Sequence, residues 1–142
     1  MLLLNNKGLT SQLAADMKKV VNNKEYSDFQ FLIEDKIIYA HKIILFARSK
    51  YFKDILEKTP EIASFKVEDF SYDIFMLVIE YIYTDHVKPL TSDLVDLSKA
   101  AAHFQLERLA TLCGNSTVIL SIMIVYKYYF SLLSHLHCLQ II

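Results

Sequence analysis

The sequence changes character abruptly near Gly114 and Asn115. From Thr117 onward it reads TVILSIMIVYKYYFSLLSHLHCLQII, in which 18 of 26 residues are apolar and Lys127 carries the only formal charge. Residues 1–116 hold the other 14 basic side chains and all 16 acidic ones. Because charged and apolar residues are mixed only before this break, we expect one folded domain there. We therefore divide the chain into an N-terminal tail (1–8), a domain (9–114) and an apolar C-terminal tail (115–142).

Composition excludes several functional classes. A net charge of −1 argues against a broad basic surface for nucleic acid. Two glycines are too few for the glycine-rich loops that bind phosphates or dinucleotides, so no cofactor is expected. Two cysteines without a CxxC motif predict neither a disulfide framework nor a zinc knuckle, which fits a reducing intracellular compartment. The opening MLLLNN is too short for the apolar core of a signal peptide.

The first expected element is an amphipathic helix that Thr10 caps and that ends at Asn22-Asn23. No hairpin returns this helix to the domain, so its apolar stripe needs a partner surface. The stripe consists of Leu9, Leu13, Met17, Val20 and Val21, which recur at spacings of three and four.

The rest of the domain reads as a mixture of short elements. Residues 27–41 alternate as two strands around a turn at Glu34-Asp35. Ser71 and Asp73 begin the strongest helix, which runs to Thr84. We further expect helices over 41–49 and 51–58, a strand over 62–68, a helix opened by Ser92 and Asp93, and a last helix ending at Gly114. This order predicts an α+β fold with helices clustered around a small sheet.

Four polar residues interrupt otherwise apolar elements: Asp28, His41, Arg48 and Ser49. A Ser/His/Asp nucleophile is disfavoured, because the sequence has neither a glycine-flanked nucleophile turn nor an evident oxyanion hole. We expect instead that Arg48 pairs with Asp28 in a partly buried structural contact beside His41. No enzyme is predicted.

The tail contains three residue types that bind metals. His135, His137 and Cys138 lie within four residues, but no fourth ligand is evident at a convergent spacing. No metal site is predicted.

Three segments together resemble a known family. YSDFQFLIEDKIIYAHKIILFARSKYF looks like the opening of a BTB/POZ domain, in which an SD-x-x-F strand leads to an aHk-x-iL-x-x-rS-x-yF segment. SYDIFMLVIEYIYTD and DLVDLSKAAAHFQLERLATLC continue the pattern in the proper order. The likeness runs from Leu9 to Cys113 and is greatest to BTB domains of proteins that carry propeller or armadillo repeats.

The resemblance implies a BTB/POZ fold, with clustered α-helices capped by a small β-sheet. It also implies homodimerisation, in which the N-terminal helix packs against the other protomer through Leu9, Leu13, Met17 and Val21. The family's buried Asp and Arg positions carry over to Asp28 and Arg48.

Many family members bind a cullin scaffold as adaptors of ubiquitin ligases, in the cytoplasm or the nucleus. The resemblance places the cullin surface on the 71–84 helix and the loop after it. The glutamate that such members often carry near the start of this helix is absent from Phe75-Met76-Leu77. A dimerisation scaffold without a cullin partner, for instance a transcriptional regulator, therefore stays open. The implied surface is Met76, Leu77, Glu80, Tyr83 and Asp85.

Three interpretations remain for residues 117–142. The segment is long enough for a membrane anchor, although Lys127 near its middle costs about 2.5–3.5 kcal/mol. It could equally form a helix that packs on the domain or its dimer mate. A third possibility is translation past a splice junction into AT-rich sequence, which would expose an aggregation-prone segment.

Overall fold

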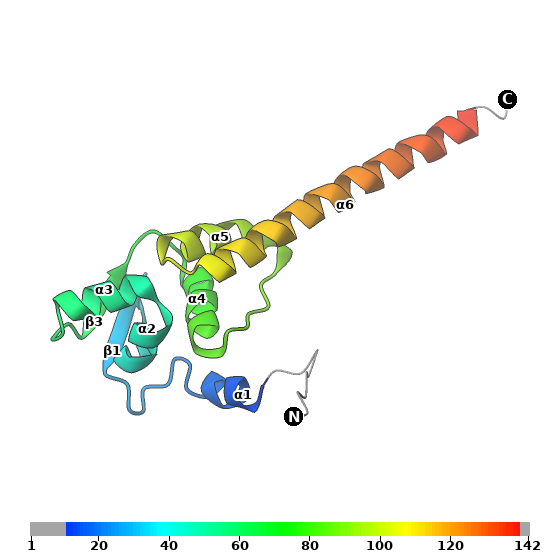
Figure 1. Ribbon diagram of the computed structural model, residues 1–142. Helices are drawn as coiled ribbons and strands as arrows, with labels where there is room; N and C mark the ends of the chain where they lie inside the picture. The colour runs from blue at the N-terminus through cyan, green and yellow to red at the C-terminus, as the bar shows by residue number, and fades with distance from the viewer. Residues whose placement is uncertain (1–10, 140–142) are drawn as a thin grey trace.

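The computed structural model describes residues 11–139, with side chains described as far as Tyr129. Helices gather around one small sheet, and a single long helix projects from them (Figure 1). The predicted α+β class is confirmed. In order, the elements are α1 (Gln12–Lys18), β1 (Phe29–Ile33), β2 (Lys36–Ala40), α2 (Lys42–Arg48), α3 (Lys50–Lys58), β3 (Ser64–Val67), α4 (Tyr72–Thr84), η1 (Thr91–Asp93), α5 (Leu94–His103) and α6 (Glu107–Leu139).

The sheet has the strand order β2-β1-β3. β1 and β2 form the predicted antiparallel hairpin, with Phe31 opposite Ile38, and Glu34 adopts a φ of 50° in the turn. β3 pairs with β1 in parallel, with Phe65 beside Phe31. Since successive side chains point to opposite faces, Phe31 and its alternate neighbours enter the core, whereas Leu32 faces outward.

An aromatic cluster joins the sheet to the helices. The Phe31 ring centroid lies 5.2 Å from that of Phe52 on α3 and 4.8 Å from that of Phe75 on α4. Phe104, just after α5, stacks on Phe52 at 5.4 Å. All four side chains are at most 1% exposed, so one core holds β1, α3, α4 and α5 together.

Helix α4 forms the centre of the domain. Its N-cap is Ser71, whose Oγ accepts a hydrogen bond from the Ile74 N–H at 3.4 Å, as predicted. Asp73 lies in the first turn, where it complements the helix dipole. The helix ends at Asp85, which adopts a left-handed φ of 61°. Most side chains of α4 are buried, because α1, α2 and α5 all pack against it.

Helix α1 differs from the expectation in two ways. Its N-cap is Ser11, whose Oγ accepts from the Ala14 N–H at 3.2 Å, whereas Thr10 lies outside the described residues. The helix ends at Lys18, so Val20 and Val21 lie in the following turn. Both valines pack against the core of the same chain together with Met17, while Ala14 is buried. The chain itself therefore covers part of the stripe that was expected to lack a partner.

The sequence predicts that the last helix ends at Gly114. In the structure this helix, α6, continues to Leu139. An isolated glycine costs roughly 1 kcal/mol inside a helix and by itself does not end one. The polar residues that follow return hydrogen bonds to the helix rather than redirecting the chain. Ser116 Oγ donates to the Leu112 carbonyl at 2.8 Å, and Ser121 Oγ donates to the Thr117 carbonyl at 2.9 Å.

Candidate interaction surfaces

The outer face of α1 is the first candidate surface. Leu13 is 71% exposed, whereas Ala14 beside it is 7% exposed and packs toward α4. Met17 and Val21 are half-buried against the chain's own core. Leu9, the fourth predicted dimer contact, lies outside the described residues. Leu13 is thus the predicted contact whose side chain is mostly free.

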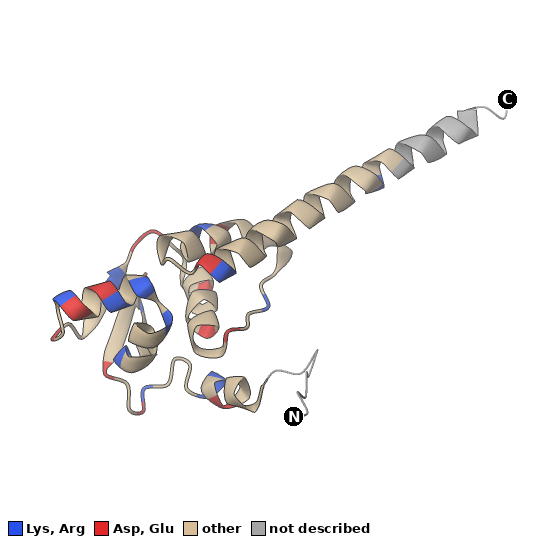
Figure 2. Cartoon of the chain, viewed as in Figure 1, with Lys and Arg blue, Asp and Glu red and all other residues tan. Residues whose placement is uncertain are grey.

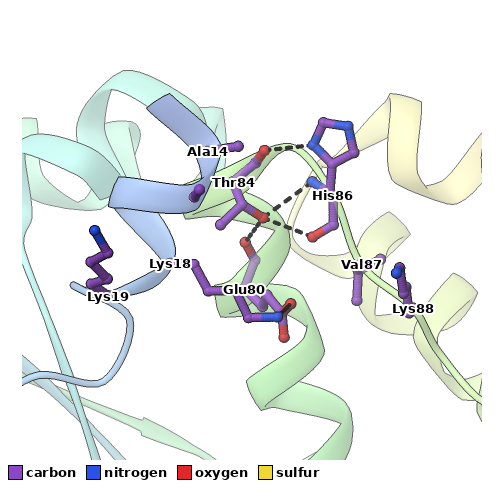
Figure 3. A pocket seen from close by; sticks show the side chains of 9 residues that line it. Ala14, Lys18, Lys19, Glu80, Thr84, His86, Val87 and Lys88 are labelled. Atoms are coloured by element: carbon purple, nitrogen blue, oxygen red, sulfur yellow. Dashed lines mark hydrogen bonds and ion pairs between the residues drawn. The ribbon is translucent and has the colours of Figure 1, made fainter. Parts of the chain in front are cut away.

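A groove of about 580 Å³ separates α1 from the C-terminal end of α4 (Figure 3). Lys18 Nζ lies 2.8 Å from Glu80 Oε1 across this groove, so an ion pair ties the two helices together. Thr84 Oγ1 donates to the Glu80 carbonyl at 2.7 Å and accepts from the His86 N–H at 3.2 Å. These bonds fix the start of the loop after α4, which forms the far wall of the groove.

The predicted cullin surface on α4 is only partly open. Met76 and Leu77 are half-buried and pack partly against the core. Glu80 is engaged by Lys18. Asp85 accepts hydrogen bonds from Arg48 Nη2 and Arg108 Nη1, each at 2.6 Å. Both carboxylates of this surface are therefore already paired within the chain.

Tyr83 does not belong to an exposed surface, which corrects the expectation. Its side chain is buried, and its hydroxyl accepts from the His41 backbone N–H at 2.9 Å. The same hydroxyl lies 2.8 Å from His41 Nδ1, and His41 Nε2 lies 3.3 Å from the Glu25 carbonyl. Burial raises the pKa of Tyr83 to about 12, so the phenol stays protonated. Tyr83 and the buried His41 tie α4 to the junction between β2 and α2.

The expected pair of Asp28 and Arg48 does not form, and both side chains are exposed. Asp28 Oδ1 instead accepts from the Lys42 backbone N–H at 2.7 Å, at the first residue of α2. Arg48 is the last residue of that helix, and six residues of helical rise separate the two ends by about 9 Å. Spacing along the sequence does not distinguish the two ends of α2, so the sequence alone does not indicate that Asp28 contacts Lys42 and not Arg48.

Asp85 connects three helices that lie far apart in the sequence. It ends α4 and binds one arginine from α2 and one from α6. Burial opposes ionisation of this carboxyl, but the guanidinium groups of Arg48 and Arg108 outweigh it and hold its pKa below the ordinary value. Arg48 Nε also donates to the Ile82 carbonyl at 3.0 Å. Because the partners lie 37 and 23 residues from Asp85, no local sequence pattern indicates this cluster.

Within the described part of the chain, no three His, Cys, Asp or Glu side chains gather as metal ligands would. The side chains of His135, His137 and Cys138 lie outside the described residues.

Relatives with known sequences match most of this chain. The "ARM repeat protein interacting with ABF2" of Arabidopsis thaliana is 31% identical over 99 residues, which make up 68% of this chain and 14% of that protein. Human BTB/POZ domain-containing protein 19 is 31% identical over 111 residues, 75% of this chain and 38% of that protein. The chain thus spans less than half the length of these curated relatives.

Solved structures share the fold. The BTB domain of human gigaxonin superposes with a TM-score of 0.63 at 22% identity, covering 81% of this chain and 95% of that one. The BTB domain of zebrafish PATZ1 gives a TM-score of 0.62 at 17% identity, covering 73% and 84%. The family model of the BTB/POZ domain matches residues 17–118. The chain therefore belongs to the BTB/POZ domain family, whose members are protein–protein interaction modules.

Proposed function

We propose that this BTB/POZ domain forms a homodimer through α1 and recruits a cullin scaffold through α4. It would thereby act as an adaptor in ubiquitin-ligase assembly, in the cytoplasm or the nucleus. The observation that carries the proposal is the division of α1 into two faces. One face packs on α4 through Ala14, and the other presents Leu13 at 71% exposure.

Leu13 is suited to a symmetric contact. Its helix packs on α4 through the buried Ala14, and the exposed ion pair of Lys18 and Glu80 joins the same two helices, so Leu13 is presented from a packed helix. In a two-fold dimer the same patch serves both protomers, and one exposed leucine per chain then meets its copy or a neighbouring apolar side chain. Complete burial of a leucine side chain contributes at most roughly 1.5–3 kcal/mol, from which the entropic cost of association is subtracted.

Light scattering of residues 1–121 tests the dimer. This fragment keeps Leu120, the last described side chain that packs against the core, and omits most of the apolar tail. We expect Leu13→Asp to be a monomer, because the contact would bury an unpaired charge. Gln12→Asp adds a comparable charge at the exposed neighbouring position and is the matched control, expected to remain a dimer. An unchanged dimer mass for Leu13→Asp would contradict the role given to α1.

The cullin contact is supported by Met76 and Leu77, two apolar side chains on α4 that remain partly exposed although they pack against the core. We expect residues 1–121 to co-elute with a cullin amino-terminal domain in size exclusion at tens of micromolar. Met76→Asp should abolish co-elution while circular dichroism shows the fold intact. Asp73→Asn, at an exposed position on the first turn of the same helix, should leave co-elution unchanged.

One observation favours a dimerising scaffold without a cullin partner. Glu80 is paired with Lys18, and Asp85 with Arg48 and Arg108, so the carboxylates of α4 are less available to a partner. If the dimer forms but the cullin domain elutes alone, the scaffold is the correct function.

A further inference from the structure

The distal half of α6 leaves the domain and carries almost no charge. No Asp, Glu, Lys or Arg occurs from Leu109 to Tyr126, and Lys127 is the one coloured residue on the described part of the projecting rod (Figure 2). The segment Glu107–Tyr129 is long and apolar enough to cross a membrane, because it contains an 18-residue window with a mean hydropathy of 1.7, of which 11% is buried. Low burial and a position far from the N-terminus distinguish it from a core helix and from a signal sequence.

Apolar side chains surround the axis of this helix. Successive residues step about 100° around an α-helix, so the residues from Val118 to Tyr129 sample every direction at intervals of about 40° or less. Within this stretch only Ser121 and Lys127 interrupt the apolar surface. The large apolar side chains listed here are each 50–75% exposed: Val118, Ile119, Ile122, Met123, Ile124, Val125, Tyr126, Tyr128 and Tyr129.

The distribution of these side chains indicates what covers them. A second helix in a two-stranded coiled coil buries a single stripe and leaves the remaining faces in water. A hydrocarbon environment covers all faces at once, and the helix satisfies its own backbone hydrogen bonds there. From Val118 to Leu139 the helix has 22 residues, about 33 Å, which matches a hydrocarbon core of about 30 Å. We propose that this segment of α6 spans a lipid bilayer and anchors the BTB/POZ domain to it.

Lys127 is compatible with this placement. Three tyrosines flank it in sequence, Tyr126, Tyr128 and Tyr129, so amphipathic rings accompany the charged group. Lys127 lies near the middle of the segment and opposes insertion, but Leu, Ile, Val and Phe fill 11 of its 22 positions and each of them favours insertion. On the domain side, Lys99 and Arg108 lie within 20 residues of Val118 and favour a cytosolic domain by the positive-inside rule.

Translation of the full 142-residue chain in the presence of microsomes tests the anchor. Membranes are extracted with alkaline carbonate and floated on a density gradient, which separates inserted protein from aggregates. An Asn-linked glycosylation acceptor after Ile142, joined by a Gly-Ser spacer, reports whether that end has crossed. We expect the chain to resist extraction, to float and to become glycosylated.

Two matched double variants refine the test. Ile124→Arg with Val125→Arg places two charges near the middle of the segment, and we expect the floated, glycosylated fraction to fall tenfold or more. Ile43→Arg with Val95→Arg makes the same change at two exposed positions on the domain and should leave that fraction unchanged. Lys127→Leu should raise it.

Several results would overturn the anchor. A chain that stays soluble as a defined oligomer would show that other copies cover α6, and one that sediments without floating would show self-association. Flotation without glycosylation would show that the end after Ile142 has not crossed, which contradicts a spanning α6 with a cytosolic domain. The dimer and cullin tests use residues 1–121, so their outcome is independent of this one.

Discussion

Helix α4 and the distal half of α6 are similar in composition and opposite in environment. Both carry apolar residues on nearly every side, but eight residues of α4 are buried, whereas the apolar side chains from Val118 to Tyr129 are largely exposed. The sheet, α1, α2 and α5 surround α4, and nothing in the described part of the chain surrounds distal α6. Apolar composition therefore indicates that a helix surface needs to be buried. The neighbouring elements determine whether the chain itself buries that surface.

The largest expected effect is a loss of stability at one core residue, which we contrast with one exposed residue of distal α6. Phe75→Ala on α4 removes a fully buried ring that contacts Phe31 and Phe104, and should lower the free energy of unfolding by about 3–5 kcal/mol. Met123→Ala on α6, 62% exposed, should change it by less than about 0.5 kcal/mol. Urea unfolding of the full chain in mild detergent measures both. A large loss for Met123→Ala would show that distal α6 packs on the domain.

The next effect concerns the polar contact that holds α4 in place. Tyr83→Phe leaves the buried His41 groups without their hydroxyl partner and should cost about 1–3 kcal/mol in urea unfolding. The matched control is Tyr128→Phe, whose ring is 75% exposed on α6 and whose loss of a hydroxyl should be neutral.

Tyr83 also predicts a loss of stability at high pH. Its pKa is about 12 in the folded chain and near 10 when unfolded, so between these values the unfolded state loses its proton first. The contribution of Tyr83 is complete below pH 10 and decreases as the pH rises toward 12, by about 2–3 kcal/mol in total. Unfolding measured from pH 9 to 12 should show a shallower decrease in Tyr83→Phe than in the wild type.

A smaller effect is expected at the junction of α4 with α6. Asp85→Asn tolerates the left-handed φ but loses the charge that binds Arg48 and Arg108, and should cost about 1 kcal/mol because both arginines are substantially exposed. Since the folded pKa of Asp85 is lowered, its contribution is present above the ordinary value of 3.8 and disappears as the pH falls through the folded pKa. The variant should therefore be less sensitive to acid. Equal acid sensitivity would contradict the cluster.

The smallest effect tests where the two regions join. Gly114 lies inside α6, and a methyl group there would meet no atom within 4 Å. Gly114→Ala should therefore stabilise residues 1–121 by about 0.5–1 kcal/mol in urea unfolding. Destabilisation would mean that the helix ends at this glycine.

Local patterns predicted most elements of the domain because their causes are local. The alternation of Phe29, Phe31 and Ile33 and the cap at Ser71 depend on residues a few positions apart. The errors arose where the cause lies elsewhere in the chain. The sequence pairs Arg48 with Asp28, but Arg48 binds Asp85 in the structure; the family resemblance places Tyr83 on a surface, but Tyr83 is buried against His41.

The sequence by itself determined the α+β class, the family and the contrast in composition between a charged N-terminal part and an apolar tail. These follow from periodicity, from ordered motifs and from composition, which are properties of the chain before it folds. Only the tertiary structure decided that Ala14 faces inward while Leu13 faces outward, that Asp85 joins three helices, and that α6 continues past Gly114. Each of these depends on which residues, distant along the chain, come within a few ångströms of one another. The separation of two residues along the sequence does not give their separation in space.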